Sequence, residues 1–137
     1  MDNFAIFKVS ASALDAQRSR MNTIASNMAN IHSTQTESGG PYKRKEVVFT
    51  TLPIGSENPS ALEGVKMAQI VDSQEPFKKI HEPGHPDADK DGFVSMPNIN
   101  IMEEMVNMMM ALRAYDANVT TFNMSKTMFL KALEIGR

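Results

Sequence analysis

Residues 98–137 decide the fold, and they read NINIMEEMVNMMMALRAYDANVTTFNMSKTMFLKALEIGR. Apolar side chains recur here at alternating steps of three and four, the spacing of a narrow seam along a helix. The predicted seam is Ile101, Met105, Met108, Leu112, Tyr115, Val119, Phe122, Phe129 and Leu133, with Lys126 as its polar exception. Such a helix would be about 50 Å long. The rest of a chain this short cannot cover it, so the stretch predicts packing against other helices.

Residues typical of helix ends flank this seam. Asn98 and Asn100 are good N-cap residues, and Glu103, three positions after Asn100, resembles a capping box. Gly136 is the expected end of the helix. An ordinary core helix of a small bundle is the alternative interpretation, although the mean helix of globular proteins has only about 11–12 residues.

A second seam runs through the first thirty residues. Its apolar positions are Phe4, Phe7, Ala11, Leu14, Met21, Ala25 and Met28, with Arg18 as the polar exception. Two such helices at opposite ends of one chain predict an antiparallel, coiled-coil-like pair. Arg18 and Lys126 have long stems that can lie along the seam while their charges stay in water. The alternative is that they specify the register or meet acidic groups of neighbouring subunits.

The segment between the helices has a different composition, because it holds all seven prolines and six of the seven glycines. Residues 46–52 and 65–71 are rich in β-branched and apolar residues and predict a β-hairpin. Residues 76–86 are expected to be an extended loop, and the basic run 43–45 a solvated strand edge. The sequence therefore predicts a mainly α fold. Its three regions are an N-terminal helix (1–32), a loop and β-hairpin middle segment (33–97) and a C-terminal helix (98–137).

Composition narrows the classes of function. The formal net charge of −2 gives no reason to expect nucleic acid or an anionic membrane as partner. The absence of cysteine excludes disulfides, thiolate chemistry and cysteine-based zinc sites. No segment is apolar enough to predict direct membrane insertion. The N-terminus lacks the basic start and apolar core of a cleaved secretion signal.

Two motifs in the middle segment imitate metal sites. Residues 81–85, HEPGH, have the spacing of zinc proteases, but Pro83 and Gly84 oppose the helix that this motif needs. Residues 87–92, DADKDG, resemble half of a calcium loop whose closing glutamate is replaced by Asn98. An Asp/Gly turn facing solvent is the preferred interpretation, with a calcium-responsive module as the alternative. We expect no metal site, no cofactor, no small-molecule substrate and no enzymatic activity.

Several runs carry a resemblance to a known family. SALDAQR (12–18) and IASNMAN (24–30) resemble the N-terminal signature of bacterial flagellar rod and hook proteins. The later runs resemble the proximal rod subunits of that axial protein family: GGPYKRK (39–45), DADKDGFV (87–94), PNIN (97–100), EEMV (103–106), RAYDANV (113–119) and KALEIG (131–136). The resemblance covers nearly the whole chain. Methionines at 108–110 depart from the family in side-chain type but keep the helical pattern.

The resemblance implies a structural subunit of the proximal rod of the flagellar basal body. Such subunits are exported by the flagellar type III apparatus without a cleaved signal, and they polymerise into the hollow periplasmic shaft that transmits torque and passes exported subunits. The implied partners are other copies of the chain, other rod subunits, the basal adapter protein and the export gate or ring. The seam residues of both helices are then the expected assembly residues. A soluble coiled-coil adaptor or export chaperone is the alternative function.

Overall fold

The computed structural model describes residues 4–54 and 62–136. Along the chain the elements are α1 (Ala5–Ala29), β1 (Lys45–Ile54), β2 (Leu62–Asp72), β3 (Lys78–His81), β4 (Phe93–Met96) and α2 (Ile101–Ile135). Residues 1–3, 55–61 and 137, which belong to the three predicted regions, lie outside the described residues. Long helices at both ends and a strand-containing middle confirm the coarse prediction of the fold.

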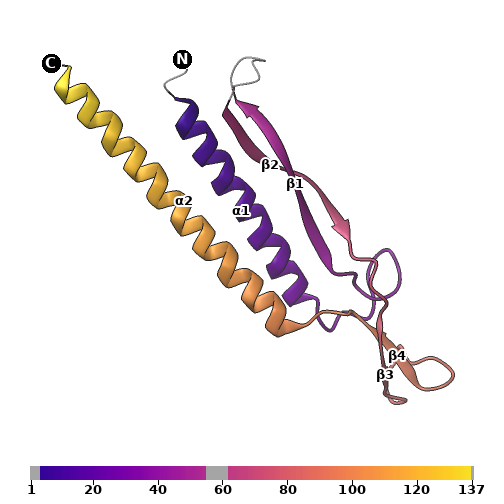
Figure 1. Cartoon of the computed structure of the whole chain (residues 1–137). Coiled ribbons are helices and arrows are strands. Elements are labelled where there is room, and N and C mark those ends of the chain that lie inside the picture. The colour runs from indigo at the N-terminus through magenta and orange to yellow at the C-terminus, as the bar shows by residue number, and fades with distance from the viewer. Residues whose placement is uncertain (1–3, 55–61, 137) are drawn as a thin grey trace.

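The two helices run antiparallel and side by side, and α1 lies between α2 and the β1–β2 hairpin (Figure 1). The β3–β4 pair projects beyond the ends of the helices where α1 ends and α2 begins (Figure 1). The central position of α1 explains its burial pattern, because Ala5, Ser10, Ala16, Thr23, Ile24 and Asn27 are buried on it, while the described part of α2 buries only Glu104 and Ala111. None of the described helices is long and apolar enough to cross a bilayer.

The β1–β2 hairpin forms where the sequence predicted it, with strands longer than predicted. Its register pairs Lys45 with Asp72 and Ile54 with Leu62, and it shifts between Val48 and Phe49. Two strands alone are marginally stable, so the hairpin needs a surface to pack on. Small side chains on α1 provide it: Val65 N donates a 3.2 Å hydrogen bond to Ser12 Oγ. A Cβ atom on Gly64 would lie only 2.5 Å from that oxygen, so glycine permits the close approach.

The β3–β4 pair corrects the prediction of an extended loop at residues 76–86. Lys78–His81 is a strand that pairs antiparallel with Phe93–Met96. Gly92 has a φ of +78°, which favours glycine, and it closes the connection between the two strands. Val94 is fully buried. The rings of His81 and Phe93 pack edge to face, with their centroids 5.1 Å apart. These long-range contacts override the proline-rich local sequence.

Candidate functional site

The predicted seam residues divide into half-buried and exposed positions. The half-buried ones are Phe7, Leu14, Met21, Met28, Met108, Tyr115, Val119, Phe122 and Phe129, and the exposed ones are Phe4, Ile101, Met105, Leu112 and Leu133. Aromatic rings of the two helices pack together at one end. The ring centroid of Phe7 lies 5.2 Å from that of Phe122 and 6.2 Å from that of Phe129. The ring centroid of Phe4 lies 5.9 Å from that of Phe129.

The side of α2 that is buried is rotated from the predicted seam. Glu104 and Ala111 are buried, and each lies one residue before a predicted position, Met105 or Leu112. Met105 and Leu112 themselves are exposed.

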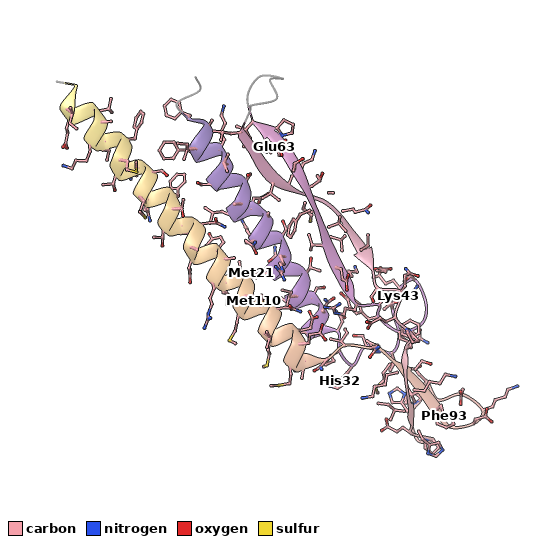
Figure 2. All side chains as sticks on the ribbon, in the orientation of Figure 1. Met21, His32, Lys43, Glu63, Phe93 and Met110 are labelled. Atoms are coloured by element: carbon pink, nitrogen blue, oxygen red, sulfur yellow. The ribbon has the colours of Figure 1, made fainter. Side chains whose placement is uncertain are left out.

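The opposite side of α2 is an outer apolar surface, which we call the methionine face. Its members are at least two-fifths exposed, and sulfur-bearing side chains project from α2 away from α1 (Figure 2). They are Met102, Met105, Val106, Met109, Met110, Met124 and Met128. No other described helix or strand covers this face, because among these elements α2 packs only against α1. A large exposed apolar surface indicates a site of protein interaction.

A buried polar cluster, here called the polar junction, ties the end of α1 to β1 and α2. It consists of Asn27, Tyr42, Arg44 and Glu104, and both Asn27 and Glu104 are only 1% exposed. Asn27 Nδ2 donates to the Lys45 carbonyl (2.9 Å) and to Glu104 Oε2 (3.1 Å). Asn27 Oδ1 accepts from Tyr42 Oη (3.1 Å) and Lys45 N (2.9 Å). The side-chain amide of Asn27 therefore forms hydrogen bonds with Tyr42, Lys45 and Glu104.

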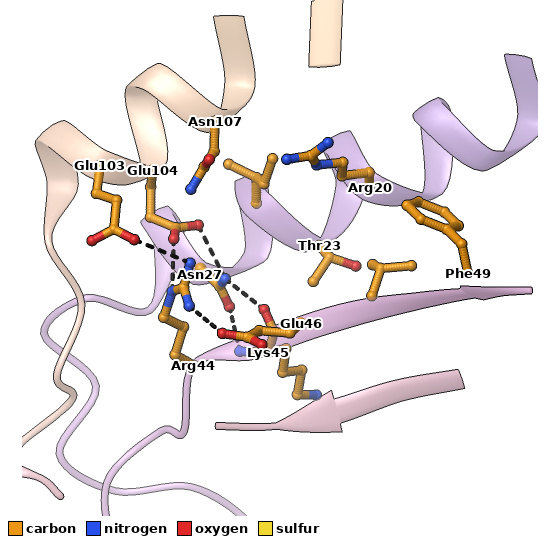
Figure 3. Close-up of a pocket in the computed structure, with 12 residues that line it drawn as sticks. Arg20, Thr23, Asn27, Arg44, Lys45, Glu46, Phe49, Glu103, Glu104 and Asn107 are labelled. Carbon is orange, nitrogen blue, oxygen red and sulfur yellow. Dashed lines mark hydrogen bonds and ion pairs between the residues drawn. The ribbon is translucent and has the colours of Figure 1, made fainter. Parts of the chain in front are cut away.

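Arg44 is the electrostatic centre of the polar junction. Its Nε donates to Glu104 Oε1 at 2.8 Å, one terminal nitrogen pairs with Glu46, and the other lies 3.7 Å from Glu103 (Figure 3). Burial alone would lower the pKa of Arg44, but the hydrogen bond to Glu104 and the surrounding carboxylates outweigh it and raise the pKa above its ordinary value. Arg44 therefore stays charged and balances the buried Glu104.

The polar junction is not predicted from the sequence. The basic run 43–45, predicted to be a solvated strand edge, contains Arg44, whose side chain is only 18% exposed. Glu103, predicted to be part of a capping box, lies near Arg44 instead, and the Asn100 side chain accepts from Met102 N at 3.0 Å. The available signal was Glu104 itself, a charged residue that the helical repeat places beside the seam.

The two metal-like motifs form a turn at the tip of the β3–β4 pair. His81 ends β3, and His85 accepts from Asp87 N through Nδ1 at 3.1 Å. Asp89 Oδ1 accepts from Asp91 N (3.0 Å) and Phe93 N (2.8 Å), the pattern of an aspartate turn. Within residues 4–54 and 62–136, no group of three or more His, Cys, Asp or Glu side chains is arranged to hold a metal ion.

An antiparallel helix pair, an outer methionine face and a buried polar junction define a structural, interacting protein. Comparison with known proteins gives the class. Residues 7–35 match the family model "Flagella basal body rod protein", and residues 90–135 match "Flagellar basal body rod FlgEFG protein C-terminal". The two matches cover most of α1 and all of α2, so the sequences of both helices match those of flagellar rod proteins.

Full-length relatives narrow the class to one family. The chain is 46% identical to the flagellar basal-body rod protein FlgC of Escherichia coli O6:H1 and 45% identical to that of Salmonella typhimurium, with 96% of each chain covered. It is 38% identical to FlgC of Bacillus subtilis over the whole of both chains. The chain belongs to the FlgC family of flagellar basal-body rod proteins. It is a structural, non-enzymatic subunit of the basal-body rod.

Proposed function

We propose that this chain forms part of the proximal rod and polymerises, with other copies and other rod proteins, into a hollow shaft. The observation that carries the proposal is the methionine face, which runs along a 35-residue helix and has no partner among the described elements. Repeated head-to-tail contacts that do not close into a ring generate a helical filament. The shaft transmits torque and passes exported subunits.

The three regions of the chain have different roles in this proposal. Residues 1–32 and 98–137 form the coiled-coil-like wall of the tube, and residues 33–97 pack outward against neighbours. The half-buried seam residues hold α1 against α2, and the exposed ones, such as Met105 and Leu112, contact other subunits. Support comes from the aromatic contacts between the helices and from the exposure of those two residues.

The proposed partners beyond the rod subunits are the basal adapter protein and the export gate or ring beneath the rod. The flagellar type III apparatus exports the chain without a cleaved signal. Methionine side chains suit such a subunit, because flexible thioethers pack against neighbours that differ in shape at the junctions between rod segments.

The substitution Met110→Asp tests the proposal. Met110 is 57% exposed, so the purified variant should keep its free energy of unfolding within about 0.5 kcal/mol. Burial of the new charge between subunits is unfavourable, so cells carrying the variant should not swim, and their basal bodies should lack a complete rod in electron micrographs.

Gln69→Glu is the matched control, because it adds the same charge at an exposed position of β2 that is already polar and lies outside the methionine face. Cells with this variant should swim. Complete rods and normal swimming with Met110→Asp would contradict assembly through the methionine face.

A further inference from the structure

A cavity of about 490 Å³ lies between the adjoining ends of α1 and α2 and the start of β1 (Figure 3). Arg20 of α1 lines it and is half-buried. Within the described part of the chain, Arg20 makes neither an ion pair nor a side-chain hydrogen bond. A partly desolvated guanidinium interacts more strongly with an anion than one in open water.

The carboxylates of the same cavity do not neutralise Arg20. Glu46, Glu103 and Glu104 all gather around Arg44, so three carboxylates surround one guanidinium at that end. The ammonium group of Lys45, which also lines the cavity, lies over the Tyr42 ring. An anion entering near Arg44 would be repelled by Glu46 and Glu103, which are 51% and 61% exposed. The Arg20 end is therefore the part of the cavity that attracts an anion.

Asn107 supplies a second donor from the facing helix. It lies three residues after Glu104 on α2, and its side chain reaches into the opening that Arg20 also lines (Figure 3). The described residues offer its amide no hydrogen-bond partner. A guanidinium and an amide N–H contributed by two helices match the two oxygens of a carboxylate.

We propose that this cavity receives an Asp or Glu side chain of an adjoining rod subunit, bound by Arg20 with help from Asn107. The inference rests on the proposed assembly into a rod and adds the chemistry of one contact. Charge complementarity identifies the occupant: among the described residues Arg20 is not paired, Asn107 is an uncommitted donor, and the carboxylates of the cavity are held by Arg44.

Charge reversal at Arg20 gives the first test. Arg20→Glu should abolish swimming and Arg20→Gln should weaken it, while the melting temperature of each purified variant stays near that of the unmodified chain. Arg18→Glu is the matched control, because Arg18 is exposed on the same helix and does not line the cavity. A melting temperature lowered by Arg20→Glu and not by Arg18→Glu would assign Arg20 to the fold and overturn the proposal.

Zero-length cross-linking identifies the occupant directly. A carbodiimide condenses the amine introduced by Arg20→Lys with a carboxylate within contact distance, forming an amide while the carbodiimide takes up water as a urea. In isolated basal bodies, mass spectrometry should find the new amide joined to an Asp or Glu outside this cavity, on a rod subunit. A link only to Glu46, Glu103 or Glu104, or no link beyond that of Arg18→Lys, would overturn the proposal.

The two proposals fail in different ways. If Arg20→Glu swims like Arg18→Glu while Met110→Asp prevents rod formation, the cavity contact is wrong and the assembly surface stands. If neither change affects the rod, assembly through these surfaces fails together with the cavity contact that rests on it.

Discussion

Glu104 of α2 joins the end of α1 to the segment that leads into β1. It is 1% exposed and accepts from both Asn27 and Arg44. A buried charge is tolerated only when it is paired and hydrogen-bonded, and both conditions hold here. The polar junction therefore specifies which end of α2 meets which end of α1, a choice that the apolar seam alone leaves open.

Removing the Glu104 carboxylate should be costly. Glu104→Ala leaves Arg44 without its buried partner, and we expect a loss of about 3–5 kcal/mol in the free energy of unfolding. Glu104→Gln keeps an acceptor for Asn27, so its loss should be about 1–3 kcal/mol. Urea unfolding of the purified chain measures both. Glu103→Gln is the control at a 61% exposed position and should change stability by less than about 0.5 kcal/mol. Equal losses for Glu103→Gln and Glu104→Ala would contradict a special role for the buried carboxylate.

The raised pKa of Arg44 predicts a flat response to pH. A group whose pKa is higher in the folded state contributes stability fully below its unfolded pKa and loses it only as pH rises through the folded value. The folded and unfolded pKa values of Arg44 both lie above the pH range in which unfolding is usually measured. The stability difference between the unmodified chain and Arg44→Gln should therefore be constant from about pH 7 to pH 10. A stability difference that shrinks across this pH window in urea unfolding would contradict the raised pKa of Arg44.

At the scale of elements, side-chain size on α1 decides how the layers pack. Ser12 and Ala16 are small, and Ser12 receives the hydrogen bond from Val65 N. The hairpin consequently approaches α1 closely enough that Gly64 has no room for a side chain. A helix with low intrinsic propensity is thus held by contacts on two sides.

Gly64→Ala tests this close approach. The added Cβ would lie 2.5 Å from Ser12 Oγ and 2.7 Å from Ile54 Cδ1, so one or both side chains must move. We expect a loss of about 1–3 kcal/mol in thermal or urea unfolding. Gly84→Ala is the matched control, because a Cβ added there would meet no described atom within 4 Å, and it should change stability by less than about 0.5 kcal/mol. Similar stability of the two variants would mean that the hairpin does not pack tightly on α1.

At the scale of the whole molecule, the unequal lengths of the helices matter most. α2 has 35 residues and α1 has 25, so α1 cannot cover α2 from end to end. The hairpin packs on α1, and the described elements leave the outer side of α2 open. The β1–β2 hairpin therefore covers one side of the helix pair, while the outer side of α2 stays uncovered by the described elements. This is expected for one subunit of a polymer.

Deleting residues 1–20 should disrupt the packing of α1 against α2 and against the β1–β2 hairpin. The deletion removes Phe4, Phe7 and Ser12, which contact α2 and the hairpin. We expect cells with only the shortened chain not to swim in soft agar and to lack complete rods in electron micrographs. Restoration by the full-length chain supplied in trans is the control. Normal rods from the shortened chain would show that α1 is dispensable for assembly.

The sequence alone determined the two terminal helices, the β1–β2 hairpin and the family resemblance, because these depend on local periodicity and on runs of neighbouring residues. Only the tertiary structure decided the β3–β4 pair, the rotation of α2 and the polar junction. Asn27, Arg44 and Glu104 are distant in sequence, and their residue types are common on solvated surfaces. Their burial follows from three-dimensional packing that no spacing along the chain encodes.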